Sequence, residues 1–455
     1  MVRDTGKGND RAAVRCLPYG VHSYRRDLEL LRDRRFALLF TARTVSVLGS
    51  AFAPVALAFG VLELAGANAT TLSVVLVAQS VPQVVFMLAG GVLADRFPRY
   101  RVMIAGEVLC AAAYTVLAAM LVTGWAPLPG LVVAAALSGI GVALFFPALV
   151  GIVPEVVAAE RLQSANGLLR LGTNSARIAG YALAGGTVVL VGAGPALAVS
   201  AAMFAGSALL IAALRLPPRV RSATGPATTP LTDLRDGWRE FVSRQWLWVI
   251  VLQFAFLVMA LQAAHGVLGP VVAKEDLGGA AAWSAVLAGE AVGMLVGVVI
   301  AIRIRPRRPM LVAVVLTLPT ALPYLLLGAY APLWTVVFGA VVMGICFDIF
   351  GVLWETSLQR EVPPDVLSRV SSYDALGSLM FGPIGLLVAG PAAAVFGARP
   401  TLIACGGLIV LATLAALCSP GVRNMRLTEP VPAGTRPDDP GPVVEPVPKV
   451  VAPGT

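Results

Sequence analysis

The sequence predicts an all-α polytopic membrane protein with twelve transmembrane helices, arranged as two six-helix bundles related by pseudo-twofold symmetry. Of its 455 residues, 58% are hydrophobic and 13% are charged, whereas about a quarter of a soluble domain is charged. The apolar residues come in blocks of about twenty, the length at which a helix rising 1.5 Å per residue crosses a hydrocarbon core. A polar stretch divides these blocks into two sets of six.

Each apolar block between clusters of charged or turn-forming residues predicts one helix. The first bundle, 36–214, is expected to hold helices at 36–62, 71–94, 102–123, 128–153, 163–190 and 195–214. The second bundle, 246–418, is expected to hold helices at 246–272, 281–302, 310–330, 333–355, 371–396 and 399–418.

Three segments fall outside the bundles. Residues 1–35 are rich in charge and show no cleavable signal peptide, so a disordered cytoplasmic segment is expected there. Residues 215–245 form a linker, and the tail 419–455 is rich in proline and expected to be disordered. The linker is expected to contain an amphipathic helix, whose apolar face comprises Leu231, Leu234, Trp238 and Phe241.

The positive charges predict the orientation in the membrane. Most of the 34 lysine and arginine residues flank helices on the side of the chain termini, and only Lys274 and Arg399 flank them on the other side. By the positive-inside rule, both termini are cytoplasmic, in a bacterial inner membrane. The net charge of +9 therefore reflects topology, and nucleic acid is not expected as a partner.

Enzymatic and ATP-driven functions are not expected. The five cysteines are scattered and the two histidines, His22 and His265, are far apart, so neither a metal site nor a cofactor is indicated. No G-x-x-x-x-G-K-[ST] motif is present for nucleotide binding.

A loop motif follows the second predicted helix. Residues 91–101 read GVLADRFPRYR, which is similar to the signature loop G-x-L-A-D-R-x-G-R-[KR]-x of the major facilitator superfamily and stands at the same loop. The sequence departs from that pattern at Pro98 and Tyr100. The residues assigned to this gating motif are Gly91, Asp95, Arg96, Arg99 and, before the eleventh helix, Arg369.

The resemblance implies that Asp95 latches the two halves together on the cytoplasmic side, with Arg369 as its expected partner. A small residue such as Gly91 permits close helix packing, and a carboxylate at a helix end can meet cationic groups. The alternative is that 95–101 is only a solvated loop.

Further segments resemble the branch of bacterial siderophore exporters and macrolide or multidrug efflux proteins. They are 147–149, 154–155, 161–166, 233–238 and 359–363. This resemblance implies a monomeric transporter in contact with membrane lipid that exports small amphipathic or apolar compounds by alternating access. Proton antiport is one option for its energy source. Uptake of a nutrient, or a sensor or scaffold role without transport, are the alternatives.

Ionisable groups inside membrane helices are functional candidates because they are costly in lipid. Glu290 and Asp348 are the expected proton-coupling candidates. The expected cavity or substrate residues are Gln83, Asn174, Arg177, Arg43 and His265. Three alternatives stay open: Arg177 forms a permanent ion pair, Arg43 extends to the inner headgroups, which we prefer, and His265 only packs against its neighbours.

Small residues predict two sites of close helix packing. Gly289, Gly293 and Gly297 form a stripe on the eighth helix. Gly180 and Gly185 lie in a segment that resembles the antiporter element G-P-x-x-G-G, which implies export.

Overall fold

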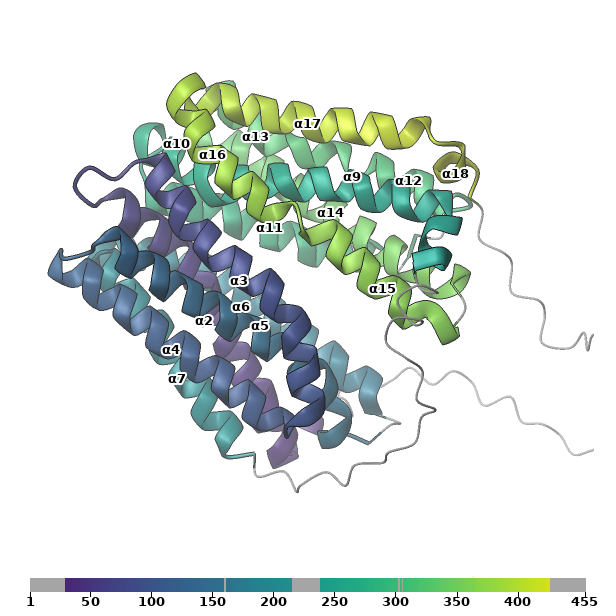
Figure 1. Cartoon of the computed structure of the whole chain (residues 1–455), viewed down its shortest axis with the longest axis horizontal. Coiled ribbons are helices and arrows are strands. Elements are labelled where there is room, and N and C mark those ends of the chain that lie inside the picture. Colours follow the sequence, from purple (N-terminus) through teal and green to yellow (C-terminus); the bar gives the residue numbers. More distant parts are fainter. Residues whose placement is uncertain are drawn as a thin grey trace, which may run out of the picture.

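The computed structural model describes residues 29–158, 161–214, 238–301, 303–304, 306–362 and 364–425, and all regular structure in these residues is helical. The chain forms two helical halves that lie side by side (Figure 1). The N-half comprises η1 (Glu29–Arg32), α2 (Arg34–Leu62), α3 (Ala69–Arg96), α4 (Arg99–Thr123), α5 (Leu128–Val156), α6 (Leu162–Val191) and α7 (Ala193–Ala212). The C-half comprises α9 (Gln245–Gln262), η3 (Ala263–Leu268), α10 (Gly269–Asp276), α11 (Ala280–Ala301), α12 (Pro309–Val315), η4 (Leu318–Ala321), α13 (Leu322–Gly328), α14 (Leu333–Glu361), α15 (Pro364–Leu379), α16 (Gly382–Phe396), α17 (Ala398–Cys418) and α18 (Pro420–Asn424).

Among the described residues, 11 helical spans are long and apolar enough to cross a membrane. The helix α6 is not one of them, although its 30 residues exceed the length needed. It carries Arg170, Asn174 and Arg177 in its middle, which lowers its hydropathy. Because α6 packs against α2 and α11, it completes the expected set of twelve.

The two halves repeat a common plan. Gly192 separates α6 from α7 and Gly397 separates α16 from α17, and both have φ of 90°. This backbone conformation is open to glycine and strained for other residues. In addition, α5 and α14 both have 29 residues and follow a proline, Pro127 or Pro332. These matched turns support the expected pseudo-twofold relation.

Three expected helices of the C-half are interrupted. The helix expected at 246–272 passes through the π-helical segment η3, and the one expected at 310–330 divides into α12, η4 and α13. The one expected at 371–396 divides into α15 and α16. Pro319, Pro323 and Pro383 lie at the last two breaks, where a proline lacks the N–H that continues a helix.

The segments outside the bundles are partly described. Leu231 and Leu234 of the expected linker helix lie outside the described residues, whereas Trp238 and Phe241 lie in a helical segment at 238–243. Their rings pack against Tyr373 of α15 at centroid distances of 5.5 and 6.1 Å. The expected tail begins at 419, but α18 forms within it, and η1 and the start of α2 lie within the expected segment 1–35.

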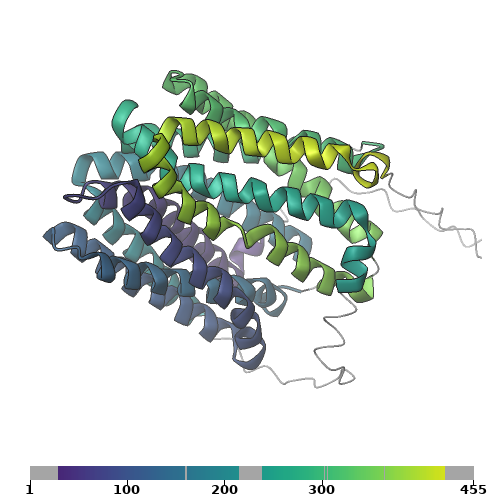
Figure 2. The ribbon, with the colours of Figure 1, turned by 45° about the horizontal axis from the view of Figure 1, so that its top comes forward.

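The halves meet through α3 with α16, which lie side by side in Figure 2, and through α6 with α11. We call the side where α2 begins and α17 ends the terminal face, and the other side the opposite face. At the opposite face, the Lys274 ammonium donates to the Leu62 carbonyl, and Gly390 lies against the backbone of Thr70. At the terminal face, Arg170 and Glu355 face each other at 4.0 Å, and both side chains are more than half exposed.

Candidate functional site

A cavity of about 380 Å³ lies between the two halves, and we call it the interface cavity. It combines apolar side chains with polar ones from five helical elements. The polar ones are Gln79, Ser80 and Gln83 of α3, Tyr181 of α6, Gln262 of α9, His265 of η3 and Glu290 of α11. A cavity of this size and mixed lining suits a small molecule.

A hydrogen-bonded chain of three side chains borders the interface cavity. The His265 Nε2 lies 2.9 Å from Glu290 Oε2, and His265 Nδ1 lies 2.7 Å from the Tyr324 hydroxyl oxygen. Against a carboxylate, Nε2 carries a proton and donates it, so Nδ1 of a neutral ring accepts from Tyr324. A protonated ring donates from both nitrogens. Both ring nitrogens of His265 therefore have a partner, and the chain links η3 to α11 and α13.

Local packing fixes the position of the histidine. The His265 ring lies 5.7 Å from the Trp283 ring, and Trp283 is almost fully buried. A side chain at Gly269 would collide with Trp283, and one at Gly266 would press on Leu386. The π-helical turn that carries His265 is of the kind that recurs at functional sites.

The facing wall of the interface cavity is held by Gln79. Its amide donates to the Tyr114 hydroxyl oxygen at 3.0 Å and to Ser138 Oγ at 2.9 Å, which links α3 to α4 and α5. A side chain at Gly139 would overlap the Gln79 carbonyl. This wall is therefore rigid, because each of its helices is tied to the next.

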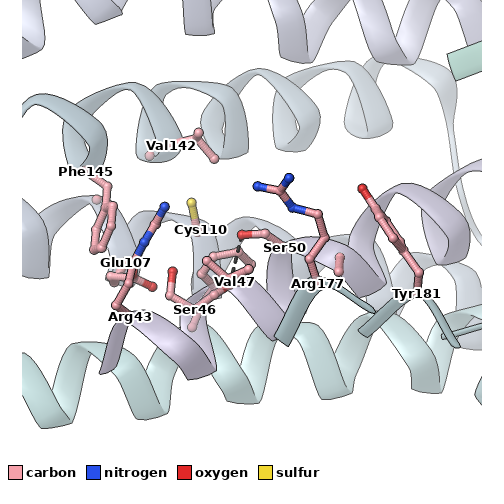
Figure 3. Close-up of a pocket in the computed structure, with 14 residues that line it drawn as sticks. Arg43, Ser46, Val47, Ser50, Glu107, Cys110, Val142, Phe145, Arg177 and Tyr181 are labelled. Atoms are coloured by element: carbon pink, nitrogen blue, oxygen red, sulfur yellow. Dashed lines mark hydrogen bonds between the residues drawn. The ribbon is translucent and has the colours of Figure 1, made fainter. Parts of the chain in front are cut away.

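A second pocket of about 200 Å³ lies within the N-half, and we call it the N-half pocket. Arg43 of α2 and Arg177 of α6 both line it, together with Glu107 of α4 (Figure 3). The Arg43 guanidinium lies 5.5 Å from the centre of the Phe145 ring. Tyr181 lines both cavities, so the two are neighbours.

The structure places the two arginines for which the sequence left alternatives open. Arg43 was expected to extend to the headgroups, but it lines the N-half pocket because α2 turns that face toward α4 and α5. Arg177 forms no ion pair within 4.0 Å with a carboxylate of the described residues. Its Nη1 instead lies 3.7 Å from the sulfur of Met294 on α11, in the other half. In this structure Arg177 therefore contacts the other half through a neutral side chain rather than through an acid of the described residues.

The other expected site residues separate into groups. Glu290, His265 and Gln83 line the interface cavity, whereas the half-buried Asn174 lines neither of the two cavities. Asp348 does not line the interface cavity, and its Cβ lies close to Gly297 of α11. One of its carboxylate oxygens is buried with no hydrogen-bond partner among the described residues.

The gating motif is described only in part. Gly91, Asp95 and Arg96 belong to α3 and Arg369 to α15, but their side chains lie outside what the structure describes. Arg99 pairs with Glu155 at 3.0 Å, which joins the start of α4 to the end of α5 within one half.

The glycines expected at packing contacts lie against backbone or small side chains. A Cβ at Gly293 would overlap the carbonyl of Val341, and Gly289 and Gly297 face the same helix α14. Gly180 faces Ala51 of α2, while Gly185 faces Ser284 of the other half. These contacts bring helix axes close together.

Sequence reasoning missed Glu107, Gln79 and Tyr324 as site residues. Glu107 is an acid in an apolar run, so the rule that selected Glu290 could also have selected it. The polar ends of Gln79 and Tyr324 have no sequence signal of their own. Their roles depend on partners from other helices.

Two repeated halves of membrane-length helices, with a polar cavity at their interface, define a multi-span membrane transport protein. A family model described as Major Facilitator Superfamily matches residues 36–379, and the chain belongs to this superfamily. Members of this superfamily are transporters of small molecules rather than enzymes, and the chain is a transporter by family.

Curated relatives and solved structures agree with this assignment. The enterobactin exporter EntS of Salmonella choleraesuis is 26% identical over 363 residues, which are 76% of this chain and 83% of that protein. The multidrug efflux pump Tap of Mycobacterium bovis is 28% identical over 417 residues, 87% of this chain and 96% of that protein. The nucleoside transporter NupG superposes with a TM-score of 0.65 at 15% identity, over 84% of this chain and 98% of that chain. An inward-facing, unoccupied bacterial homolog of the human lysosomal transporter Spinster gives a TM-score of 0.65 at 16% identity, over 88% of this chain and 99% of that chain.

Proposed function

We propose that this transporter exports small amphipathic compounds by alternating access, in antiport with protons. Its relatives in sequence include exporters of a siderophore and of drugs. The cargo binds in the interface cavity, and the two halves rock around it to expose it to either side of the membrane. Both termini lie in the cytoplasm of the bacterial cell.

The single observation that carries the coupling proposal is the contact between His265 and Glu290 in the interface cavity. In the cycle, a proton from the outside binds to this pair when the cavity opens outward, and the cargo leaves. When the cavity opens inward, the proton passes to the cytoplasm and a new cargo molecule enters. Of the two expected acids, we choose Glu290 over Asp348, because Asp348 does not line the interface cavity.

The terminal face closes in the outward-open state through Asp95 and Arg369, as the latch resemblance implies. A carboxylate on α3 and a guanidinium on α15 attract each other across the two halves. Transport by Asp95→Asn tests this latch, and an unchanged rate would refute it.

The test of export uses cells that express the wild type, Glu290→Gln or Asp348→Asn, loaded with a panel of fluorescent amphiphiles with and without a protonophore. We expect wild-type cells to accumulate less dye, and the protonophore to remove the difference. Glu290→Gln should accumulate as much dye as cells without the transporter, whereas Asp348→Asn should retain export. Glu63→Gln, at the exposed end of α2, is the matched control.

Two results would contradict this assignment. Retained proton-driven export in Glu290→Gln would remove Glu290 from the coupling step. Loss of export in Asp348→Asn alone would transfer that step to Asp348.

Uptake of a small polar nutrient is the second candidate function. The observation that favours it is the polar lining of the interface cavity, with three glutamines, a histidine and an acid. Higher accumulation of a polar probe in wild-type cells, abolished by a protonophore, would favour uptake over export.

A further inference from the structure

We propose that the N-half pocket binds the anionic head of the cargo between Arg43 and Arg177, so that the substrates are amphipathic organic monoanions, with a carboxylate as the model group. The inference rests on the proposed transport function and names its substrate class. Neither the family resemblance nor the names of the relatives assign a function to the N-half pocket.

The N-half pocket contains more positive than negative charge. Two guanidinium groups enter the N-half pocket, and Glu107 is the acid among the residues that line it. Glu107 is 2% exposed, and the hydroxyl groups of Ser46 and Ser207 lie near its carboxylate. With Glu107 ionised the pocket retains a positive charge, and a monoanion would neutralise it. A charge in a low-dielectric site is unfavourable unless it is paired.

Arg43 and Arg177 both keep unused hydrogen-bond donors. A guanidinium has five N–H donors in a fork that matches the two oxygens of a carboxylate. Arg43 stacks on Phe145, and Arg177 reaches only the weak acceptor Met294 Sδ. Neither arginine has a carboxylate of the described residues within 4.0 Å, so donors of both remain available to a ligand.

The N-half pocket lies next to the interface cavity. Figure 3 shows Arg43 and Arg177 entering from α2 and α6, with Ser46, Ser50 and Cys110 in the space between them. Tyr181 lines this pocket and the interface cavity. The apolar body of a cargo molecule can therefore lie in the larger cavity while its anionic head reaches the arginines.

Contact with both halves gives Arg177 a second role. Its guanidinium projects from α6 and touches Met294 of α11. An anion bound to Arg177 thus lies at the junction that changes when the halves rock. Binding of the anionic head to Arg177 is then coupled to the rocking of the two halves.

The experiment compares two probes that share a fluorophore. Dansylglycine is a monoanion at neutral pH, and dansylglycinamide is its neutral analogue. Binding to the purified full-length protein in detergent is followed by dansyl emission. We expect the wild type to bind the anion at least about tenfold more tightly than the amide, as charge-assisted bonds to guanidinium allow. Arg43→Gln and Arg177→Gln should each weaken binding of the anion much more than binding of the amide, and so remove this preference.

Matched controls make the outcome specific. Arg303→Gln removes one exposed positive charge outside the N-half pocket and should keep the preference. The two arginines lie on different helices, so a variant that fails to fold leaves the other as a test. Equal binding of both probes by the wild type, no binding of the anion, or equal weakening of both probes in either variant would overturn the proposal.

Transport of the probes separates this inference from the proposed function. Proteoliposomes that export the amide but show no preference for the anion would support export and refute the anionic subsite. An anion preference that depends on the arginines, without movement of either probe, would support the subsite and refute export of these compounds.

Discussion

The two halves share one plan but differ in how continuous their helices are. In the N-half, α2 to α6 run for 25 to 30 residues without interruption, although α2 contains Pro54 and α3 contains Pro82. In the C-half, three spans are broken, and the π-helical break carries His265. Regular helices thus form the rigid wall around Gln79, whereas the proposed proton-coupling pair joins His265 on the irregular segment η3 to Glu290 on the regular helix α11.

The difference has a physical basis. Membrane helices tolerate irregular turns where neighbouring helices satisfy the freed backbone groups. In the C-half one such turn, η3, carries His265, which lines the interface cavity together with Glu290 of α11. We therefore expect packing to be equally strict in both halves, but proton coupling to depend on the C-half alone.

The largest expected effect is on packing. Gly139→Val in the N-half and Gly293→Val in the C-half would each place a side chain into the carbonyl of a neighbouring helix, that of Gln79 or Val341. Both should destabilise the fold by about 1–3 kcal/mol or more, measured as a lower midpoint of thermal unfolding in detergent. Gly186→Ala, where a Cβ meets nothing within 4 Å, is the control. If only one of the two valine variants lost stability, the expectation of equally strict packing in both halves would be wrong.

An intermediate effect is expected at two buried tyrosines. Tyr324→Phe removes the partner of His265 Nδ1 in the C-half, and Tyr114→Phe removes a partner of the Gln79 amide in the N-half. A lost hydrogen bond of about 0.5–1.5 kcal/mol corresponds to roughly a twofold to tenfold change. Tyr324→Phe should slow proton-driven export by this factor, whereas Tyr114→Phe should lower the unfolding midpoint and leave the export rate unchanged. Equal loss of export in both variants would contradict the division between the halves.

The smallest effect is expected at the terminal face. The side chains of Arg170 and Glu355 are 71% and 61% exposed and 4.0 Å apart, and such pairs contribute about 0–1 kcal/mol. Arg170→Gln should therefore change the export rate by no more than a fewfold, in the same dye assay. A much larger loss would mean that this pair belongs to the gate.

The sequence predicted the number and order of spans, because blocks of apolar residues report membrane crossing directly. It did not predict the breaks at Pro319, Pro323 and Pro383, because prolines also occur inside unbroken helices, as Pro54 and Pro82 do. Glu290 could be selected as a candidate because an isolated acid in an apolar run is rare, and its role in proton coupling stays a prediction. Its pairing with His265, and the entry of Arg43 into the N-half pocket, could not, because both depend on which helix faces stand opposite each other.

The polarity of α6 has a consequence for the synthesis of this protein. An arginine at the centre of a membrane helix costs roughly 2.5–3.5 kcal/mol during insertion, and α6 carries both Arg170 and Arg177. A nascent chain that ends just after α6 would therefore insert it poorly. The following helix, α7, is apolar and separated from α6 by Gly192 alone. We therefore expect α6 and α7 to enter the membrane together as a hairpin, in which the apolar α7 offsets the insertion cost of α6.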